Sequence, residues 1–189
     1  MNNFPLICIG GSAGGLAAYI KLLQCLPAKL NAAVIIVNHI TIAPTMLHEV
    51  LARFSAMPVT LITEGLPIHA DQVYIIPANR DLHIALDHFH LEEISKPRGW
   101  PDVITVFFRS VIENWRGKTV AVVLSGYDGD GAAAMCSIQA LGGVTIAQRP
   151  TTAAQPDMPE SAIATGCIDF ILSPEEIALE IRQLSAMPV

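Results

Sequence analysis

The chain has few charged residues and no cluster of basic ones. Its 189 residues include 11 Lys and Arg against 17 Asp and Glu, which gives a formal net charge of −6. Because proteins bind nucleic acids through basic patches, a nucleic acid is not an expected partner. No apolar run approaches the roughly 18 residues of a membrane-spanning helix, and Met1-Asn2-Asn3 lacks the basic start of a secretory signal. We therefore expect a soluble, cytoplasmic protein with no direct membrane insertion.

Cysteine is also scarce. The 4 cysteines, Cys8, Cys25, Cys136 and Cys167, lie inside apolar segments and lack the Cys-x-x-Cys spacing of a structural zinc site. In a chain of this kind such residues are usually buried, reduced thiols. We therefore expect free thiols, with neither a disulfide nor a structural zinc.

Apolar residues, by contrast, make up 52% of the chain and fall into a clear pattern. Continuous apolar runs alternate with amphipathic stretches, which is typical of parallel strands covered by helices on both faces. The predicted strands are 6–9, 33–37, 59–62, 73–76, 119–124, 144–147 and 168–172, and the predicted helices are 16–26, 44–54, 104–115, 132–141 and 174–184. The pattern predicts an α/β fold with a mostly parallel sheet, and the length and lack of a linker predict a single domain over residues 1–189.

One segment reads differently from the rest. Residues 82–86 and 89–91 flank Asp87-His88 at a spacing that predicts a short antiparallel hairpin, which we expect to extend one edge of the sheet. Residues 95–102 contain too much proline and glycine for regular structure, so they predict a loop near a site.

A glycine-rich turn follows the first predicted strand. The run Gly10-Gly11-Ser12-Ala13-Gly14 fits the Gly-x-Ser-x-Gly pattern of a nucleophile elbow, in which glycines allow a sharp kink that leaves the serine hydroxyl uncovered. A dinucleotide-binding fingerprint would need glycine at Ser12, and a Walker loop would need Lys and Ser or Thr after its last glycine, where Leu16 and Ala17 stand. The turn therefore indicates acyl transfer by Ser12, with a plain glycine-rich connection as the alternative.

A serine hydroxyl needs a base, usually an imidazole that a carboxylate orients. His39 directly follows the second predicted strand, and functional groups gather at the carboxyl ends of strands in open parallel sheets. It is the candidate base, with a hydrogen-bonded loop histidine as the alternative. His88 and His90 lack a third ligand for a metal. The histidines expected at the surface are His48, His69, His83, His88 and His90.

Two carboxylates, Asp128 and Asp130, lie in the turn after the strand predicted at 119–124. Asp130 could cap the following helix or hold an imidazole, and these roles can coexist. A purely structural turn and cap is the alternative. Ser125 is a further hydroxyl at this strand end, but it lacks the glycine-flanked elbow around Ser12.

Five ordered motifs resemble those of the chemotaxis receptor methylesterases, in their CheB-type catalytic domain. They lie at residues 9–15, 37–39, 73–82, 124–132 and 158–163, so the resemblance covers nearly the whole chain. It implies a doubly wound sheet and a catalytic triad of Ser12, His39 and Asp130, with the register favouring Asp130 over Asp128. Because the first predicted strand starts close to Met1, we expect the chain to lack the receiver domain of the usual family member.

The resemblance also implies an activity. It is the hydrolysis of glutamate γ-methyl esters on the cytoplasmic helices of methyl-accepting chemoreceptors or a similar methylated protein, and it leaves glutamine deamidation open. Triad chemistry needs no cofactor and no metal. Two alternatives remain: a serine hydrolase of another ester or amide, and an inactive module that binds a partner on the same scaffold.

Several positions depart from the family's pattern. Ala13 stands where threonine is frequent, Asn38 where glutamine is frequent, and Tyr127-Asp128 where the usual pair is methionine and glycine. Residues 100–105 do not reproduce the family's Arg-Pro-Ser-x-Asp tract. Without the threonine hydroxyl, the backbone N–H groups of Ala13 and Tyr127 are the candidates for an oxyanion hole.

Overall fold

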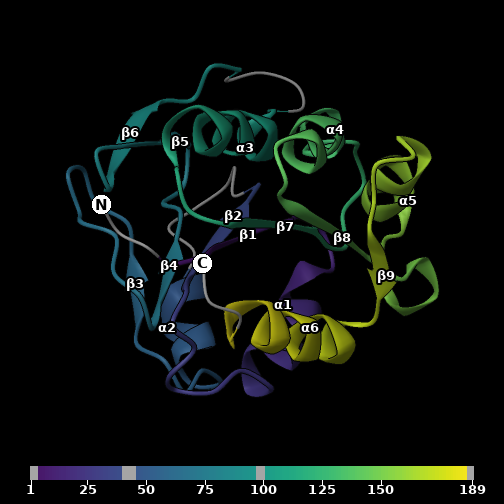
Figure 1. Cartoon of the computed structure of the whole chain (residues 1–189), viewed down its shortest axis with the longest axis horizontal. Helices are drawn as coiled ribbons and strands as arrows, with labels where there is room; N and C mark the ends of the chain where they lie inside the picture. Colours follow the sequence, from purple (N-terminus) through teal and green to yellow (C-terminus); the bar gives the residue numbers. More distant parts are fainter. Residues whose placement is uncertain (1–3, 40–45, 97–100, 187–189) are drawn as a thin grey trace.

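The computed structural model describes residues 4–39, 46–96 and 101–186. Within these residues, seven parallel strands form one sheet in the order β3-β4-β2-β1-β7-β8-β9 (Figure 1). The strands are β1 (Leu6–Gly11), β2 (Ala33–Asn38), β3 (Val59–Leu61), β4 (Gln72–Ile75), β7 (Thr119–Val123), β8 (Val144–Gln148) and β9 (Phe170–Leu172). The chain builds the sheet outward from β1 to one edge, then returns to the other side of β1, so the sheet is doubly wound as predicted.

Helices cover both faces of the sheet (Figure 1). One face carries α1 (Gly15–Gln24), α2 (Leu47–Ala52) and α6 (Pro174–Ala186), and the other carries α3 (Val103–Asn114), α4 (Ala132–Ala140) and α5 (Asp157–Ala164). All six residues of β1 are buried, because a central parallel strand is covered on both sides. None of the described helices is long and apolar enough to cross a membrane.

The hairpin forms, but not where it was expected. Strands β5 (Arg80–Ala85) and β6 (His88–Glu93) pair with each other as a separate two-stranded sheet, so the prediction that they extend the main sheet was wrong. The hairpin instead packs on α3, where Ser110 Oγ accepts a hydrogen bond of 2.9 Å from the backbone N–H of Ile84. Leu82 and Phe89 are fully buried there, so the apolar face of the hairpin is satisfied by a helix.

The predicted strands are all present, and the helices differ in two places. The helix predicted at 44–54 is described from Leu47, and Pro44 lies outside the described residues. Helix α5 was not predicted. Its short run contains Pro159, which weakens a helical pattern, yet proline is tolerated in a first turn, where no intrahelical N–H bond is lost.

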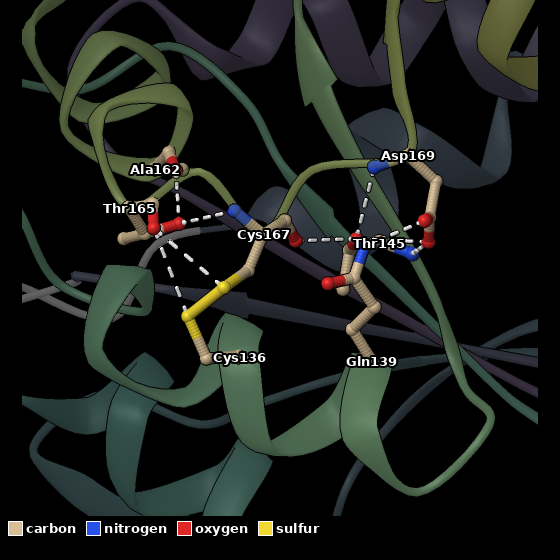
Figure 2. The surroundings of a disulfide bond; sticks show 7 residues. All are labelled: Cys136, Gln139, Thr145, Ala162, Thr165, Cys167 and Asp169. Carbon is tan, nitrogen blue, oxygen red and sulfur yellow. Dashed lines mark hydrogen bonds between the residues drawn. A yellow bond between two sulfur atoms is a disulfide. The ribbon is translucent and has the colours of Figure 1, made fainter.

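The prediction of free cysteines was wrong for two of them. Cys136 on α4 and Cys167, in the loop between α5 and β9, form a disulfide bond with their Cα atoms 4.9 Å apart (Figure 2). They are 31 residues apart in sequence, and only the packing of α4 against α5 brings them together. Cys8 and Cys25 are free thiols, as predicted. Burial raises the pKa of the Cys8 thiol, which keeps it protonated.

Candidate active site

The strand order brings the predicted site residues to one edge of the sheet. Gly11 at the end of β1 pairs with Asn38 at the end of β2, so Ser12 and His39 are the next residues on two adjacent strands. On the other side of β1, the backbone N–H of Ser12 donates to the carbonyl of Ser125, just after β7, at 2.8 Å. Adjacent strands lie about 5 Å apart, so the three predicted segments meet at the carboxyl edge.

The serine turn is a tight connection from β1 into α1. Gly14 has φ 74°, a left-handed conformation that favours glycine, and it directly precedes the helix. A Cβ atom on Gly126 would lie 3.1 Å from Ser12 Cβ and 2.5 Å from Met158 Cε, so a larger residue there would crowd the serine. Ser125 Oγ donates to the Ala13 carbonyl at 2.7 Å and accepts from Gln155 N–H at 2.9 Å. These two hydrogen bonds join Ser125 to the serine turn and to Gln155.

Asp130 is held by the start of α3. Its Oδ2 accepts from the backbone N–H of Ile104 and its Oδ1 from that of Thr105, both at 2.8 Å. These are first-turn amides, which have no partner within the helix and lie at its positive end. Thr105 Oγ1 in turn accepts from Gly131 N–H at 2.8 Å. The sequence left two roles open for Asp130, capping the following helix and holding an imidazole. Asp130 does not cap that helix, since the N-terminus of α4 has no side-chain cap.

His39 lies between two carboxylates. Its Nε2 donates to Asp130 Oδ2 at 2.7 Å, and its Nδ1 lies 3.1 Å from Asp128 Oδ2. The second pair is within ion-pair distance but is not aligned as a hydrogen bond, because neither atom has a partner of good geometry. The side chains of His39 and Asp130 are 5% and 2% exposed, so this cluster is shielded from water.

The electrostatics of the cluster favour an imidazolium. Burial lowers the pKa of His39, but the close contacts with Asp128 and Asp130 and their negative charges outweigh it and raise the pKa from 6.5 to about 9. For Asp128, burial raises the pKa of the carboxyl, but the close contact with His39 and the hydrogen bond from the Asp130 N–H together lower it below its ordinary value. The two shifts agree, since each describes a stabilised ion pair.

Ser12 lies beside this pair without being joined to it. Among the described residues, no hydrogen bond links Ser12 Oγ to His39, so the structure connects two of the three predicted side chains and places the third on the adjacent strand end. Because Asp130 occupies Nε2, Nδ1 is the ring nitrogen without a hydrogen bond. That nitrogen faces Asp128 in this structure.

Two backbone N–H groups at this edge of the sheet are available to bind an oxyanion. In the described part of the chain, the N–H groups of Ala13 and Tyr127 donate to no protein acceptor, whereas Gly126 N–H is used by the Gln155 carbonyl at 3.1 Å. Tyr127 as a whole residue is 53% exposed. Both groups therefore remain candidates for an oxyanion hole.

Four of the other histidines have local side-chain contacts away from the serine turn, namely His48, His83, His88 and His90. His90 Nδ1 lies 2.9 Å from Glu64 Oε1, and His88 Nδ1 donates to the Leu86 carbonyl at 2.7 Å. Over residues 4–39, 46–96 and 101–186, no group of three or more His, Cys, Asp or Glu side chains could hold a metal ion.

Two features of the site were not predicted. One is the direct contact of Asp128 with His39, which the Asp-x-Asp spacing in a strand-end turn could have indicated. The other is the anchoring of Asp130 on α3, for which the sequence gives no local signal. A cavity of about 290 Å³ lies beside these carboxylates. Its lining includes Asp102, Thr105, Arg109, Asp128 and Asp130.

The structure thus combines a doubly wound sheet with a serine turn and a buried His-Asp pair at its carboxyl edge. Comparison with known proteins identifies the family. The family model described as CheB methylesterase matches residues 7–181. The chain belongs to the CheB methylesterase family.

Named relatives agree with this assignment. Over 183 residues the chain is 34% identical to protein-glutamate methylesterase/protein-glutamine glutaminase 4 of Burkholderia thailandensis, covering 95% of this chain and 53% of that protein. It is 38% identical over 182 residues to the corresponding protein 1 of Cupriavidus pinatubonensis, covering 94% of this chain and 53% of that protein. The chain therefore spans about half the length of these relatives.

A solved structure shares the fold. The crystal structure of the Thermotoga maritima CheB methylesterase catalytic domain superposes with a TM-score of 0.84 at 24% sequence identity. The match covers 97% of this chain and 100% of that one, so the architecture agrees from end to end.

Proposed function

We propose that this chain is a protein-glutamate methylesterase that hydrolyses glutamate γ-methyl esters through an acyl-serine intermediate. The observation that carries the proposal is the buried 2.7 Å bond between His39 and Asp130, one strand away from the Ser12 elbow. Membership of the family supports the choice of ester, and the names of its relatives add glutamine deamidation as a second reaction.

The reaction uses the chain's own groups throughout. His39 accepts the proton of Ser12 as the serine oxygen attacks the ester carbonyl, and Asp130 stabilises the imidazolium that forms. The N–H groups of Ala13 and Tyr127 bind the oxyanion. His39 then gives its proton to the departing oxygen, so that methanol leaves. Water attacks the acyl-serine with His39 again as base, which releases a glutamate side chain and restores Ser12.

The substrates that fit this proposal are the methylated cytoplasmic helices of chemoreceptors or of a similar methylated protein, and the reaction then takes place in the cytoplasm. Ser12 is half-buried and lies at the carboxyl edge of the sheet, where a side chain that protrudes from a substrate can approach its hydroxyl. No metal or organic cofactor has a role in the steps above.

The test compares methanol release from methylated receptor fragments by the wild type and two variants. Ser12→Ala should lower kcat by several orders of magnitude, on the order of 10⁶ in a comparable triad enzyme, without changing the unfolding midpoint. Ser137→Ala, which changes an exposed serine on α4, is the matched control and should retain full activity. Unchanged hydrolysis by Ser12→Ala would remove this serine from the mechanism.

Two further measurements separate the alternatives. A fluorophosphonate should label Ser12 in the wild type, whereas a module that only binds a partner would not react. A panel of methylated receptor fragments and simple esters then distinguishes a receptor esterase from a hydrolase of other substrates, which would prefer the simple esters.

A further inference from the structure

We propose that Asp128 is a positioning residue that competes with Ser12 for Nδ1 of His39 and holds the imidazole in a resting state. The inference rests on the proposed function, in which His39 is the base for Ser12. It concerns the regulation of that step, since the imidazole must leave Asp128 before Ser12 can be activated.

The first argument is the number of ring nitrogens. An imidazole has two, and in this structure each faces a carboxylate oxygen, Nε2 at 2.7 Å and Nδ1 at 3.1 Å. A general base needs one nitrogen with a lone pair directed at the serine hydroxyl. With Asp130 on Nε2 and Asp128 beside Nδ1, neither nitrogen is directed at Ser12.

The second argument is the charge that this arrangement requires. A neutral imidazole carries one N–H and one lone pair, so one of the two carboxylates would face a lone pair and be repelled. Both contacts are favourable only when both nitrogens carry protons. The imidazolium has no lone pair to accept the proton of Ser12, so the resting state is inactive.

The two carboxylates are held very differently. Asp130 accepts backbone bonds from Ile104 and Thr105 in addition to His39, and its side chain is 2% exposed. Asp128 accepts one backbone bond, from Asp130 N–H at 3.0 Å, and its side chain is 16% exposed. Asp130 is therefore the fixed partner of the base, and Asp128 is the one that can move.

Space for that movement lies next to Asp128. The residue lines the cavity of about 290 Å³, whose wall also includes Arg109 from α3. A carboxylate that turns into this cavity leaves Nδ1 and approaches a guanidinium, which offsets the lost contact with the imidazolium. The proton of Nδ1 then passes to solvent, and the free lone pair becomes available to Ser12.

The charged groups around His39 are few. In the part of the chain that the structure describes, Asp128 and Asp130 are the charged side chains within 4 Å of its ring, and both come from the turn after β7. From α3, Arg109 reaches the cavity, and Asp102 lines it just before the helix begins. The serine turn after β1 contributes no ionisable side chain between Gly10 and Gly15.

The test is the pH profile of kcat/KM together with the titration of the His39 ring by NMR, both on the full chain. Replacing Asp128 by asparagine removes one negative charge and keeps the size of the side chain. Loss of a charged neighbour typically moves a pKa by about 1–2 units, so Asp128→Asn should move the acid limb to lower pH. Esterase activity at pH 7 should then rise roughly tenfold or more, with an unchanged plateau at high pH.

Controls distinguish this role from a structural one. Asp102→Asn removes a charge from the same cavity without touching His39, and it should leave the acid limb and the NMR titration in place. Asp128→Glu keeps the negative charge, so the acid limb of its kcat/KM profile should stay at the higher pH of the wild type. If Asp128→Asn is unstable, Asp128→Gly supplies a second variant that also lacks the carboxylate.

The outcomes separate the two proposals. An unchanged His39 titration in Asp128→Asn, or activity that falls equally at every pH, overturns the role of Asp128 and leaves the esterase proposal standing. A shifted titration in a protein that hydrolyses no ester supports the contact and overturns the proposed function. A shifted titration with a matching shift of the acid limb supports both.

Discussion

The disulfide between Cys136 and Cys167 predicts a large loss of stability without a loss of activity. The bond closes a loop with a sequence separation of 31 residues, which restricts the unfolded chain. For a loop of this length, the chain-entropy relation gives about 3.7 kcal/mol at 25 °C. Removing both sulfurs, in Cys136→Ser with Cys167→Ser, should lower the free energy of unfolding by up to about that amount.

The folded state should change little, because the same loop is fastened by other contacts (Figure 2). Thr145 Oγ1 donates to the Cys167 carbonyl at 2.7 Å, Thr145 N–H donates to Asp169 at 2.9 Å, and Gln139 Nε2 donates to Asp169 at 2.7 Å. These bonds keep the segment on β8 and α4 after the sulfurs are gone. The serine turn lies elsewhere, so kcat should stay within about twofold of the wild type.

Denaturant unfolding of the wild type, the double variant and Cys25→Ser measures the effect. Cys25 is a half-buried free thiol, so its variant is the matched control and should lose far less stability. A thiol titration of the unfolded, unreduced wild type should find two reactive groups. Four reactive thiols, or equal stability of the double variant and the wild type, would refute the reasoning.

Two further predictions concern the cluster around Asp130. Thr105→Val removes the acceptor of the buried Gly131 N–H, so it should cost about 1–3 kcal/mol of stability and lower kcat. The control Thr60→Val, on the edge strand β3, should change neither the stability nor kcat. Chemical unfolding measures the stability, and ester hydrolysis measures kcat. The raised pKa of His39 predicts that its contribution to folding is complete below about pH 6.5 and is lost as the pH rises through about 9. Melting temperatures of wild type and His39→Gln should therefore converge on going from pH 6 to pH 10, and a constant difference would contradict the shift.

Much of the fold is readable from the sequence, because strands buried on both faces are continuous apolar runs. The seven runs that were predicted all form strands of the sheet, and the order of the chain places the ends of β1, β2 and β7 together. The features that were missed depend on packing between distant segments. The sulfurs of Cys136 and Cys167 meet only when α4 and α5 lie side by side, and the hairpin finds its apolar partner on α3.

The site, like the fold, was predicted in part from the sequence and depends in part on packing between distant segments. Ser12 and His39 lie at adjacent strand ends, which strand order alone predicts, and the Asp130 contact follows from the turn after β7. The sequence spacing of Asp128 and Asp130 does not predict which of the two carboxylates forms the hydrogen bond to His39. It depends on side-chain directions in one turn and on the amides of Ile104 and Thr105, which come from a helix more than twenty residues earlier in the chain.

The anchoring of Asp130 on α3 has a mechanical consequence. At one point along its length this helix is bonded to the hairpin through Ser110 and Ile84, and at its first turn it grips the carboxylate of Asp130. At 1.5 Å per residue, Ser110 and Ile104 lie about 9 Å apart along the axis, so one helix holds both the hairpin and the carboxylate that binds His39. A displacement of the hairpin that carries α3 with it therefore also displaces the partner of His39.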